Sequence, residues 1–125
     1  MSGDAQDVVL IVEDDDIIRQ LLHDHLQDQG YHVLEAENGV KAFEILATKP
    51  HLDLMITDFQ LQGPFSGVDI AEPAVKLRPD LKVIFISGYP MEIRECIHPI
   101  AKTATIVAKP FLFDDLNKAI LRELV

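Results

Sequence analysis

Four short apolar runs in this sequence each lead into side chains that could take part in chemistry. The groups at their ends are Glu13 and Asp14, Asp58, Ser87, and Lys109. Apolar runs of this length, bounded by turn-forming residues, are typical of buried strands. In an open parallel sheet, ligands bind beyond the carboxyl ends of the strands. If the sheet is parallel, we therefore expect acidic, hydroxyl and ammonium groups to gather at one edge.

The carboxylates of Glu13, Asp14 and Asp58 are candidate ligands of a hard cation. Clustered negative charges repel one another, and a bound cation relieves that repulsion. Oxygen ligands suit Mg²⁺, which binds through a few carboxylates, retained waters and a phosphate oxygen. Asp15 and Asp16 continue the acidic run, but their position favours helix capping, in which a carboxylate accepts hydrogen bonds from free backbone N–H groups.

This set of groups favours phosphoryl transfer to a carboxylate oxygen. Asp58 would be the nucleophile, Ser87 would donate a hydrogen bond to a phosphoryl oxygen, and Lys109 would offset charge. Ordinary structural roles are also open: a strand-terminal acid, a turn-forming serine and a surface lysine. The combination favours chemistry, because an idle pocket has no need of all these groups together.

Several other kinds of site are not supported. No glycine-rich phosphate loop follows any strand, which argues against nucleotide binding of the P-loop or Rossmann kind. The His residues show no ligand spacing, and Cys96 is a single cysteine, so neither a zinc site nor a disulfide framework is indicated. A metal-dependent phosphatase with an Asp nucleophile would want a second Asp two residues later, where Gln60 stands.

Length and charge narrow the class of protein. A chain of 125 residues is long enough for one domain with a real core. We expect a single domain over residues 1–125, with 1–7 as a disordered tail. The net charge of −10 opposes direct binding of nucleic acid or anionic membranes and suits a basic partner surface or a divalent cation. Without a membrane-spanning run or a signal peptide, we expect a cytoplasmic protein.

Hydrophobic periodicity predicts five strands alternating with five helices. The strands are expected over residues 8–12, 31–36, 52–57, 82–86 and 104–108. The helices are expected to begin near Asp15 or Asp16, at Asn38, at Ser66 and Gly67, at Pro90, and near Phe113. Pro73 predicts a kink or a short third helix, and the residues from Pro99 to Thr103 are expected to be irregular. This alternation implies an α/β fold with a doubly wound parallel sheet, covered by helices on both faces.

Apolar stripes predict the buried faces of the helices. The first helix would bury Ile18, Leu21, Leu22 and Leu26; the second Val40, Phe43, Ile45 or Leu46, and Ala47; and the last Leu116, Ala119, Ile120 and Leu124.

From Val8 to Val125 the chain resembles the receiver domain of two-component response regulators. The motifs that carry the resemblance are Val-Leu-Ile-Val-Glu-Asp-Asp (9–15), Ala-Glu-Asn-Gly (36–39), Leu-Met-Ile-Thr-Asp (54–58), Ile-Ser-Gly-Tyr (86–89) and Ala-Lys-Pro-Phe (108–111). Each is weak alone, but together, in order and at the expected strand ends, they are highly specific. The resemblance implies a flavodoxin-like (βα)5 fold with strand order 2-1-3-4-5.

The resemblance also implies a role for each candidate residue. Asp58 would be the phosphoacceptor, and Ser87 and Lys109 would contact the phosphoryl group. The Mg²⁺ ligands would be Glu13, Asp14, Asp58 and the backbone carbonyl of Gln60. The Lys109-Pro110 peptide bond is expected to be cis, a form that X–Pro bonds tolerate.

The resemblance extends to partners and output. The domain would take phosphoryl from a histidine kinase or a histidine phosphotransfer domain. It would promote its own phosphorylation and dephosphorylation without being a turnover enzyme. The surface formed by the helix from Pro90, the strand at 104–108 and the last helix would then change, for an output partner or for a homodimer.

Three departures from the family pattern leave a second hypothesis open. Ile106 stands where a Tyr or Phe commonly switches, a role that Tyr89 could take over. Gln62 stands where Pro is usual, in a loop one residue longer before Gly67, as in receivers of hybrid histidine kinases. No output domain is expected after the last helix. The first two features favour a phosphorylation-independent interaction module, whereas the complete acidic set with Ser87 and Lys109 favours an active receiver.

Overall fold

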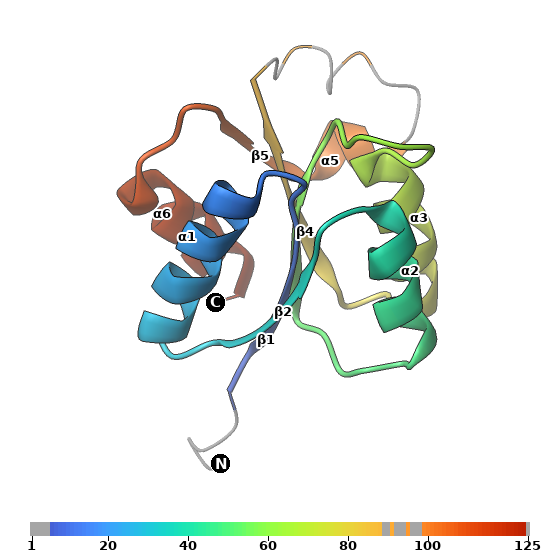
Figure 1. Ribbon diagram of the computed structural model, residues 1–125, viewed down its shortest axis with the longest axis horizontal. Helices are drawn as coiled ribbons and strands as arrows, with labels where there is room; N and C mark the ends of the chain where they lie inside the picture. Colours follow the sequence, from blue (N-terminus) through green and yellow to red (C-terminus); the bar gives the residue numbers. More distant parts are fainter. Residues whose placement is uncertain (1–5, 89–90, 92–94, 96–98, 125) are drawn as a thin grey trace.

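The computed structural model describes residues 6–88, 91, 95 and 99–124, in which five parallel strands form one sheet (Figure 1). The strands are β1 (Val8–Val12), β2 (His32–Ala36), β3 (Leu54–Asp58), β4 (Lys82–Ser87) and β5 (Thr105–Ala108). Their order is β2-β1-β3-β4-β5, and every neighbouring pair is parallel. The predicted fold class and strand order are therefore confirmed.

Helices cover both faces of this sheet. They are α1 (Asp16–Asp28), α2 (Gly39–Ala47), α3 (Gly67–Leu77), α5 (Pro99–Thr103) and α6 (Phe113–Leu124). Figure 1 shows α1 and α6 on one side of the sheet and α2, α3 and α5 on the other.

Two hydrophobic clusters fill the space between the sheet and the helices. Along β1, Val9 and Ile11 face the cluster that contains Leu22 of α1, while Leu10 and Val12 face the opposite cluster. Because side chains alternate between the two faces of a strand, a strand covered on both faces has to be apolar throughout. This explains the unbroken apolar run and places its polar continuation, Glu13, at the sheet edge.

Polar caps begin three of the helices. Asp15 accepts hydrogen bonds from the backbone N–H groups of Ile17 and Ile18, at 2.9 and 3.0 Å. Asn38 caps α2 through the N–H of Lys41, and Ser66 and Asp69 form a reciprocal capping box at the start of α3. Asp15 thus has the capping role that the sequence favoured for it.

Two expectations that rested on proline were wrong. Helix α3 is not shortened at Pro73 but continues to Leu77, so the short-helix alternative was wrong, while the kink predicted at Pro73 stays a prediction. Its buried face outweighs the cost of a proline, about 3 kcal/mol in a helix interior. The residues from Pro99 to Thr103 form α5 instead of an irregular segment. Proline suits the first turn of a helix, and the completely buried Ala101 anchors this one.

The apolar stripes were only partly correct. Leu22 and Leu26 of α1 are buried, as predicted, but Leu21 is 53% exposed and Val40 of α2 is 51% exposed. In α2 it is Leu46, and not Ala47, that faces the core. Single exposed apolar residues are common on protein surfaces and carry no meaning unless several of them form a patch.

The remaining expectations concern the ends of the chain and the segment after β4. Gln6 and Asp7, expected in the tail, are tethered to the protein: Gln6 donates to the carbonyl of Gly30, and Asp7 accepts from the N–H of His32. Tyr89, Cys96 and most of the helix predicted from Pro90 lie outside the described residues. No helix in the described ranges is long and apolar enough to cross a membrane.

Candidate functional site

The predicted site residues lie at the carboxyl edge of the sheet. Asp58 and Ser87 are the last residues of β3 and β4, and Lys109 follows β5 directly. Glu13 and Asp14 follow β1, the strand that lies next to β3. The sheet order reverses direction at β1 and β3, and such switch points are where open α/β sheets bind their ligands.

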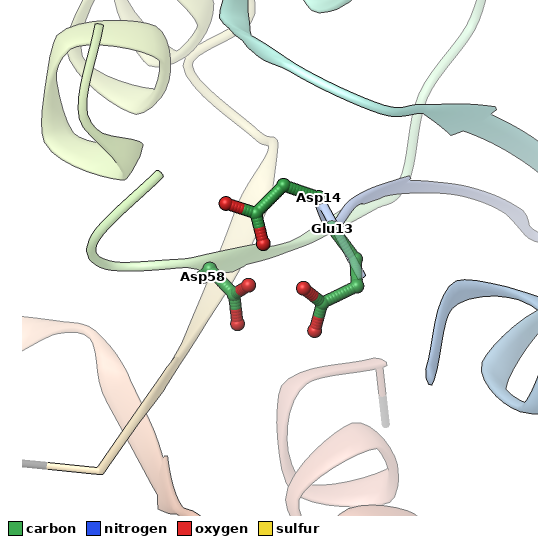
Figure 2. Close-up of side chains that lie close together, drawn as sticks. All are labelled: Glu13, Asp14 and Asp58. Atoms are coloured by element: carbon green, nitrogen blue, oxygen red, sulfur yellow. The ribbon is translucent and has the colours of Figure 1, made fainter. Parts of the chain in front are cut away.

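Three carboxylates converge at this edge (Figure 2). One oxygen from each of Glu13, Asp14 and Asp58 lies within 4.8 Å of the others. Glu13 is only 1% exposed and Asp58 only 4% exposed, whereas Asp14 is half-buried. Two of the three negative charges are therefore largely removed from water, which makes their mutual repulsion strong.

Lys109 supplies positive charge to two of these acids. Its Nζ lies 2.9 Å from Oδ1 of Asp58 and 3.3 Å from Oε1 of Glu13. The contact with Asp58 lacks the alignment of a hydrogen bond, and among the described residues no group donates to this buried oxygen. Buried polar atoms normally accept a hydrogen bond, whereas in the part of the chain that the structure describes Oδ1 of Asp58 is paired only with the charge of Lys109.

The electrostatics of the cluster are visible in two shifted pKa values. The pKa of Glu13 is raised to about 8, chiefly by burial and further by a hydrogen bond to Asp58 and repulsion from its charge. The N–H of Asp15 and the charge of Lys109 oppose it. For Lys109, burial lowers the pKa, but the acids Asp58 and Glu13 outweigh burial and raise it overall. The lysine therefore stays charged, and Glu13 takes up a proton to relieve the excess negative charge.

The residues present fit a divalent cation of the Mg²⁺ type. All the clustered donors are carboxylate oxygens, which are hard ligands, and Oδ1 of Asp58 is buried without a hydrogen bond among the described residues. A cation at this position would reduce the repulsion between the Glu13 and Asp58 carboxylates, as protonation of Glu13 does in its absence.

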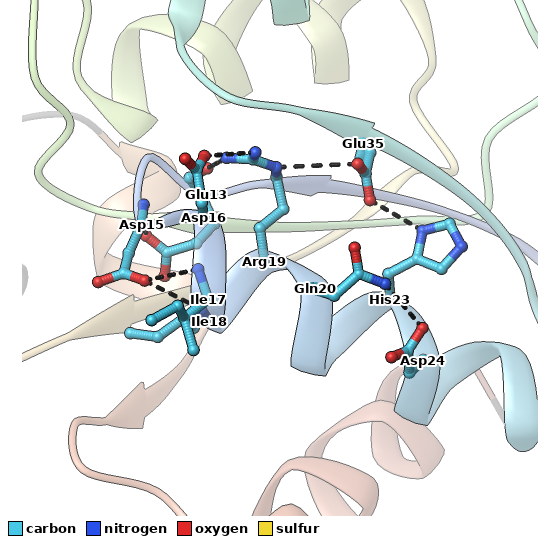
Figure 3. Close-up of polar contacts among 10 residues, drawn as sticks. All are labelled: Glu13, Asp15, Asp16, Ile17, Ile18, Arg19, Gln20, His23, Asp24 and Glu35. Atoms are coloured by element: carbon cyan, nitrogen blue, oxygen red, sulfur yellow. Dashed lines mark hydrogen bonds and ion pairs between the residues drawn. The ribbon is translucent and has the colours of Figure 1, made fainter.

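Arg19 braces the strand end that carries two of the acids (Figure 3). Its Nη1 donates a 2.9 Å hydrogen bond to the backbone carbonyl of Glu13, and its Nη2 pairs with Asp16 at 2.6 Å. Its Nε lies 3.8 Å from Glu35 of β2, which also contacts His23 at 2.8 Å. The sequence analysis missed this arginine, since an ordinary helical position gives no sign that the side chain reaches back to a carbonyl.

The loop after β3 contacts the acidic cluster from the other side. The backbone N–H of Gln62 donates a 3.0 Å hydrogen bond to Oδ2 of Asp14. Gly67 packs directly on the end of β3, because a Cβ at this position would lie 2.2 Å from the backbone oxygen of Asp58. Gln62 was singled out in the sequence for its residue type alone, and its contact with Asp14 was not predicted.

The other predicted features have mixed outcomes. The Lys109-Pro110 peptide bond is cis, as expected. Ser87 is 6% exposed and lies on the strand next to Asp58, and the backbone N–H of Lys109 donates to its carbonyl. The metal-ligand role of the Gln60 carbonyl and the phosphoryl contact of Ser87 stay predictions.

Comparison with known proteins agrees with this geometry. The response regulator receiver domain family matches residues 9–121. The response regulator receiver protein CpdR of Brucella abortus is 32% identical over 117 residues, which cover 94% of this chain and 96% of CpdR. The sensor kinase CckA of the same organism is 33% identical, but the match covers only 12% of its length.

Solved structures show the same fold. The response regulator TrrA of Thermotoga maritima, solved in complex with Mg(2+)-BeF, superposes with a TM-score of 0.82 at 32% identity, covering 95% of this chain and all of TrrA (100%). The receiver domain of the hybrid histidine kinase CckA superposes with a TM-score of 0.78 at 29% identity, covering 94% of this chain and 99% of that domain. The chain described here belongs to the response regulator receiver domain family of two-component signalling, whose members are signalling phosphoacceptor domains rather than turnover enzymes.

Proposed function

We propose that Asp58 accepts a phosphoryl group, in the presence of Mg²⁺, from a phosphohistidine on a histidine kinase or a histidine phosphotransfer domain. The observation that carries this proposal is the meeting of three carboxylates within 4.8 Å with the Lys109 ammonium 2.9 Å from Asp58. The complex of TrrA with Mg(2+)-BeF supports the same chemistry for this chain.

The transfer exchanges one bond at phosphorus for another. A carboxylate oxygen of Asp58 forms the new P–O bond, while the P–N bond to the donor imidazole breaks and its electron pair returns to the ring nitrogen. Bound Mg²⁺ supplies positive charge that stabilises the phosphoryl oxygens in the transition state. Lys109 adds a second positive charge, and the Ser87 hydroxyl donates a hydrogen bond to one of these oxygens.

The roles of the acids follow from their position. Glu13 and Asp14 would hold the cation together with Asp58, and the Gln60 carbonyl would be a further ligand. Glu13 must release its proton to do so, because a ligating carboxylate is deprotonated. Metal binding and proton release at this edge are therefore linked.

An apolar groove beside the site is suited to the phosphodonor. A cavity of about 450 Å³ lies between α1 and the loop before α6, and Leu21, Lys109 and Phe113 are among its lining residues. Ile17 and Leu112, at 73% and 71% exposed, enlarge the exposed apolar surface of the same two segments. A donor that delivers phosphoryl to Asp58 has to contact the protein next to Lys109, so we place the donor surface around the phosphohistidine in this groove.

Mass spectrometry of the intact protein tests the chemistry. The chain is incubated with acetyl phosphate, with and without Mg²⁺, as wild type, Asp58→Asn and Asp15→Asn. We expect a Mg²⁺-dependent gain of one phosphoryl group in the wild type and in Asp15→Asn, since Asn caps a helix as well as Asp does. Asp58→Asn should gain none. A folded wild type that gains nothing would refute the proposal and favour a phosphorylation-independent interaction module.

The donor groove has its own matched pair of variants. Leu21 and Leu121 are 53% and 55% exposed, but of the two only Leu21 lines the groove. With a histidine kinase chosen from a panel because it phosphorylates the wild type, Leu21→Asp should slow transfer at least tenfold and Leu121→Asp should not. Both should accept phosphoryl from acetyl phosphate normally. Equal transfer rates for the two variants would place the donor elsewhere.

A further inference from the structure

The loop between β3 and α3 is attached to the acidic cluster by a main-chain hydrogen bond. The N–H of Gln62 donates to Oδ2 of Asp14 at 3.0 Å, across 48 residues of sequence. The side chain of Gln62 is exposed, so this contact depends on the backbone at position 62 and not on the amide side chain.

The rest of the loop holds this N–H in position. At the start of the loop, the N–H of Phe59 donates a 2.9 Å hydrogen bond to the carbonyl of Ile86. At its end, the N–H of Gly67 donates a 2.8 Å hydrogen bond to the carbonyl of Phe59, which joins the two ends. Gly63 follows Gln62 directly and has a φ of +96°, a backbone conformation that glycine adopts without strain. The loop is therefore fixed at its ends and turned sharply beside the residue that contacts Asp14.

We infer that the backbone N–H of Gln62 positions the Asp14 carboxylate for the cation. It holds one carboxylate oxygen and leaves the other for the metal. This inference rests on the proposed function, because it assumes that Asp14 is a Mg²⁺ ligand. Hydrogen bonds from an outer shell of residues orient metal-binding side chains, and losing one typically lowers metal affinity by about 10- to 100-fold.

The inference predicts a particular pattern of substitutions at position 62. Any residue except proline supplies a backbone N–H. Gln62→Ala should therefore keep Mg²⁺ affinity within about twofold, whereas Gln62→Pro should lower it by about tenfold or more. Titration calorimetry with Mg²⁺ measures both dissociation constants, and thermal unfolding without metal shows whether each variant is folded.

A second measurement decides the question if Gln62→Pro does not fold. In the wild type, the Gln62 amide proton should be protected from exchange and shifted downfield by its bond to a carboxylate, as observed by NMR. Asp14→Ala should remove both effects, and Asp15→Ala should not. An amide that is unaffected by Asp14→Ala would overturn the inference.

The outcomes separate this inference from the proposed function. If the wild type binds no Mg²⁺, the proposed function fails and the inference fails with it. If the wild type binds Mg²⁺ and a folded Gln62→Pro binds it equally well, the N–H has no positioning role, and the proposed function stands unchanged.

Discussion

Arg19 is bonded to the main chain of Glu13: its guanidinium donates a 2.9 Å hydrogen bond to the Glu13 carbonyl. The arginine side chain is only 14% exposed, and the same group pairs with Asp16 at 2.6 Å. A hydrogen bond from a charged donor is stronger than one between neutral groups. The link therefore holds the turn between β1 and α1, the turn in which Glu13 and Asp14 lie.

Replacing Arg19 should affect both stability and metal binding. We expect Arg19→Ala to lower the free energy of unfolding by about 1.5–3 kcal/mol, the usual contribution of a hydrogen bond to a charged group. Mg²⁺ affinity should fall as well, since Glu13 and Asp14 lose their support. Urea unfolding and Mg²⁺ titration measure the two effects. Arg122→Ala is the control, because Arg122 is exposed on α6; equal effects of the two substitutions would contradict the bracing role.

Asp14 and Asp15 are adjacent, yet their substitutions should have opposite consequences. Asp15→Ala removes the N-cap of α1 and should lower the free energy of unfolding by about 1 kcal/mol. It should leave intact the stabilisation by Mg²⁺, which is about 2.7 kcal/mol at a concentration 100 times the dissociation constant. Asp14→Ala should abolish most of that stabilisation. Thermal unfolding with and without Mg²⁺ measures both, and loss of the Mg²⁺ effect in Asp15→Ala would make Asp15 a ligand.

In metal-free buffer, Glu13 should make stability fall as the pH rises. Its pKa is 4.5 when unperturbed and about 8 in the folded protein. Below pH 4.5 the folded and unfolded proteins both hold the proton on Glu13, and the stabilisation is complete. Between pH 4.5 and about 8 only the folded protein holds it. The free energy of unfolding therefore falls by up to about 1.4 kcal/mol per pH unit in this range. Above the folded pKa the loss is complete.

The matching variant is Glu13→Gln, which stays neutral at every pH. Its unfolding free energy should depend less on pH than that of the wild type. The difference should be clear at roughly pH 5.5–7.5, which lies between the unfolded and folded pKa values of Glu13. Denaturation in EDTA at several pH values measures the slopes. Glu37→Gln, at an exposed position, should keep the wild-type slope. A Glu13→Gln slope as steep as the wild type would show that Glu13 is not the titrating group.

The sequence predicted the residues of the acidic site better than the contacts of Arg19 and Gln62 that support them. Glu13, Asp58 and Lys109 could be placed together because parallel strands share one carboxyl edge. Each of these residues ends an apolar run, which is visible in the sequence. The Arg19 and Gln62 contacts could not be predicted, because one ends on a main-chain carbonyl and the other begins at a main-chain N–H. Neither leaves a pattern of residue types.

The errors in the fold have a similar origin. The residues from Pro99 to Thr103 were predicted to be irregular because proline often ends a helix, although proline is equally suited to begin one. Leu21 was assigned to the core because its spacing fits a stripe. Spacing cannot tell a core leucine from one that lines a surface groove, and the structure places Leu21 in such a groove.

Gly67 should tolerate no larger residue, because it packs against the backbone at the end of β3. A Cβ at Gly67 would lie 2.2 Å from the Asp58 oxygen, so the loop or the strand would have to move. We expect Gly67→Ala to lower the free energy of unfolding by about 1–3 kcal/mol, as overpacking does, and to slow phosphorylation by acetyl phosphate through displacement of Asp58. Gly88→Ala is the matched control, since a Cβ at Gly88 meets no described atom within 4 Å. Urea unfolding and intact-mass kinetics measure the two effects, and a fully stable Gly67→Ala would mean that the loop yields to the added methyl group at little cost.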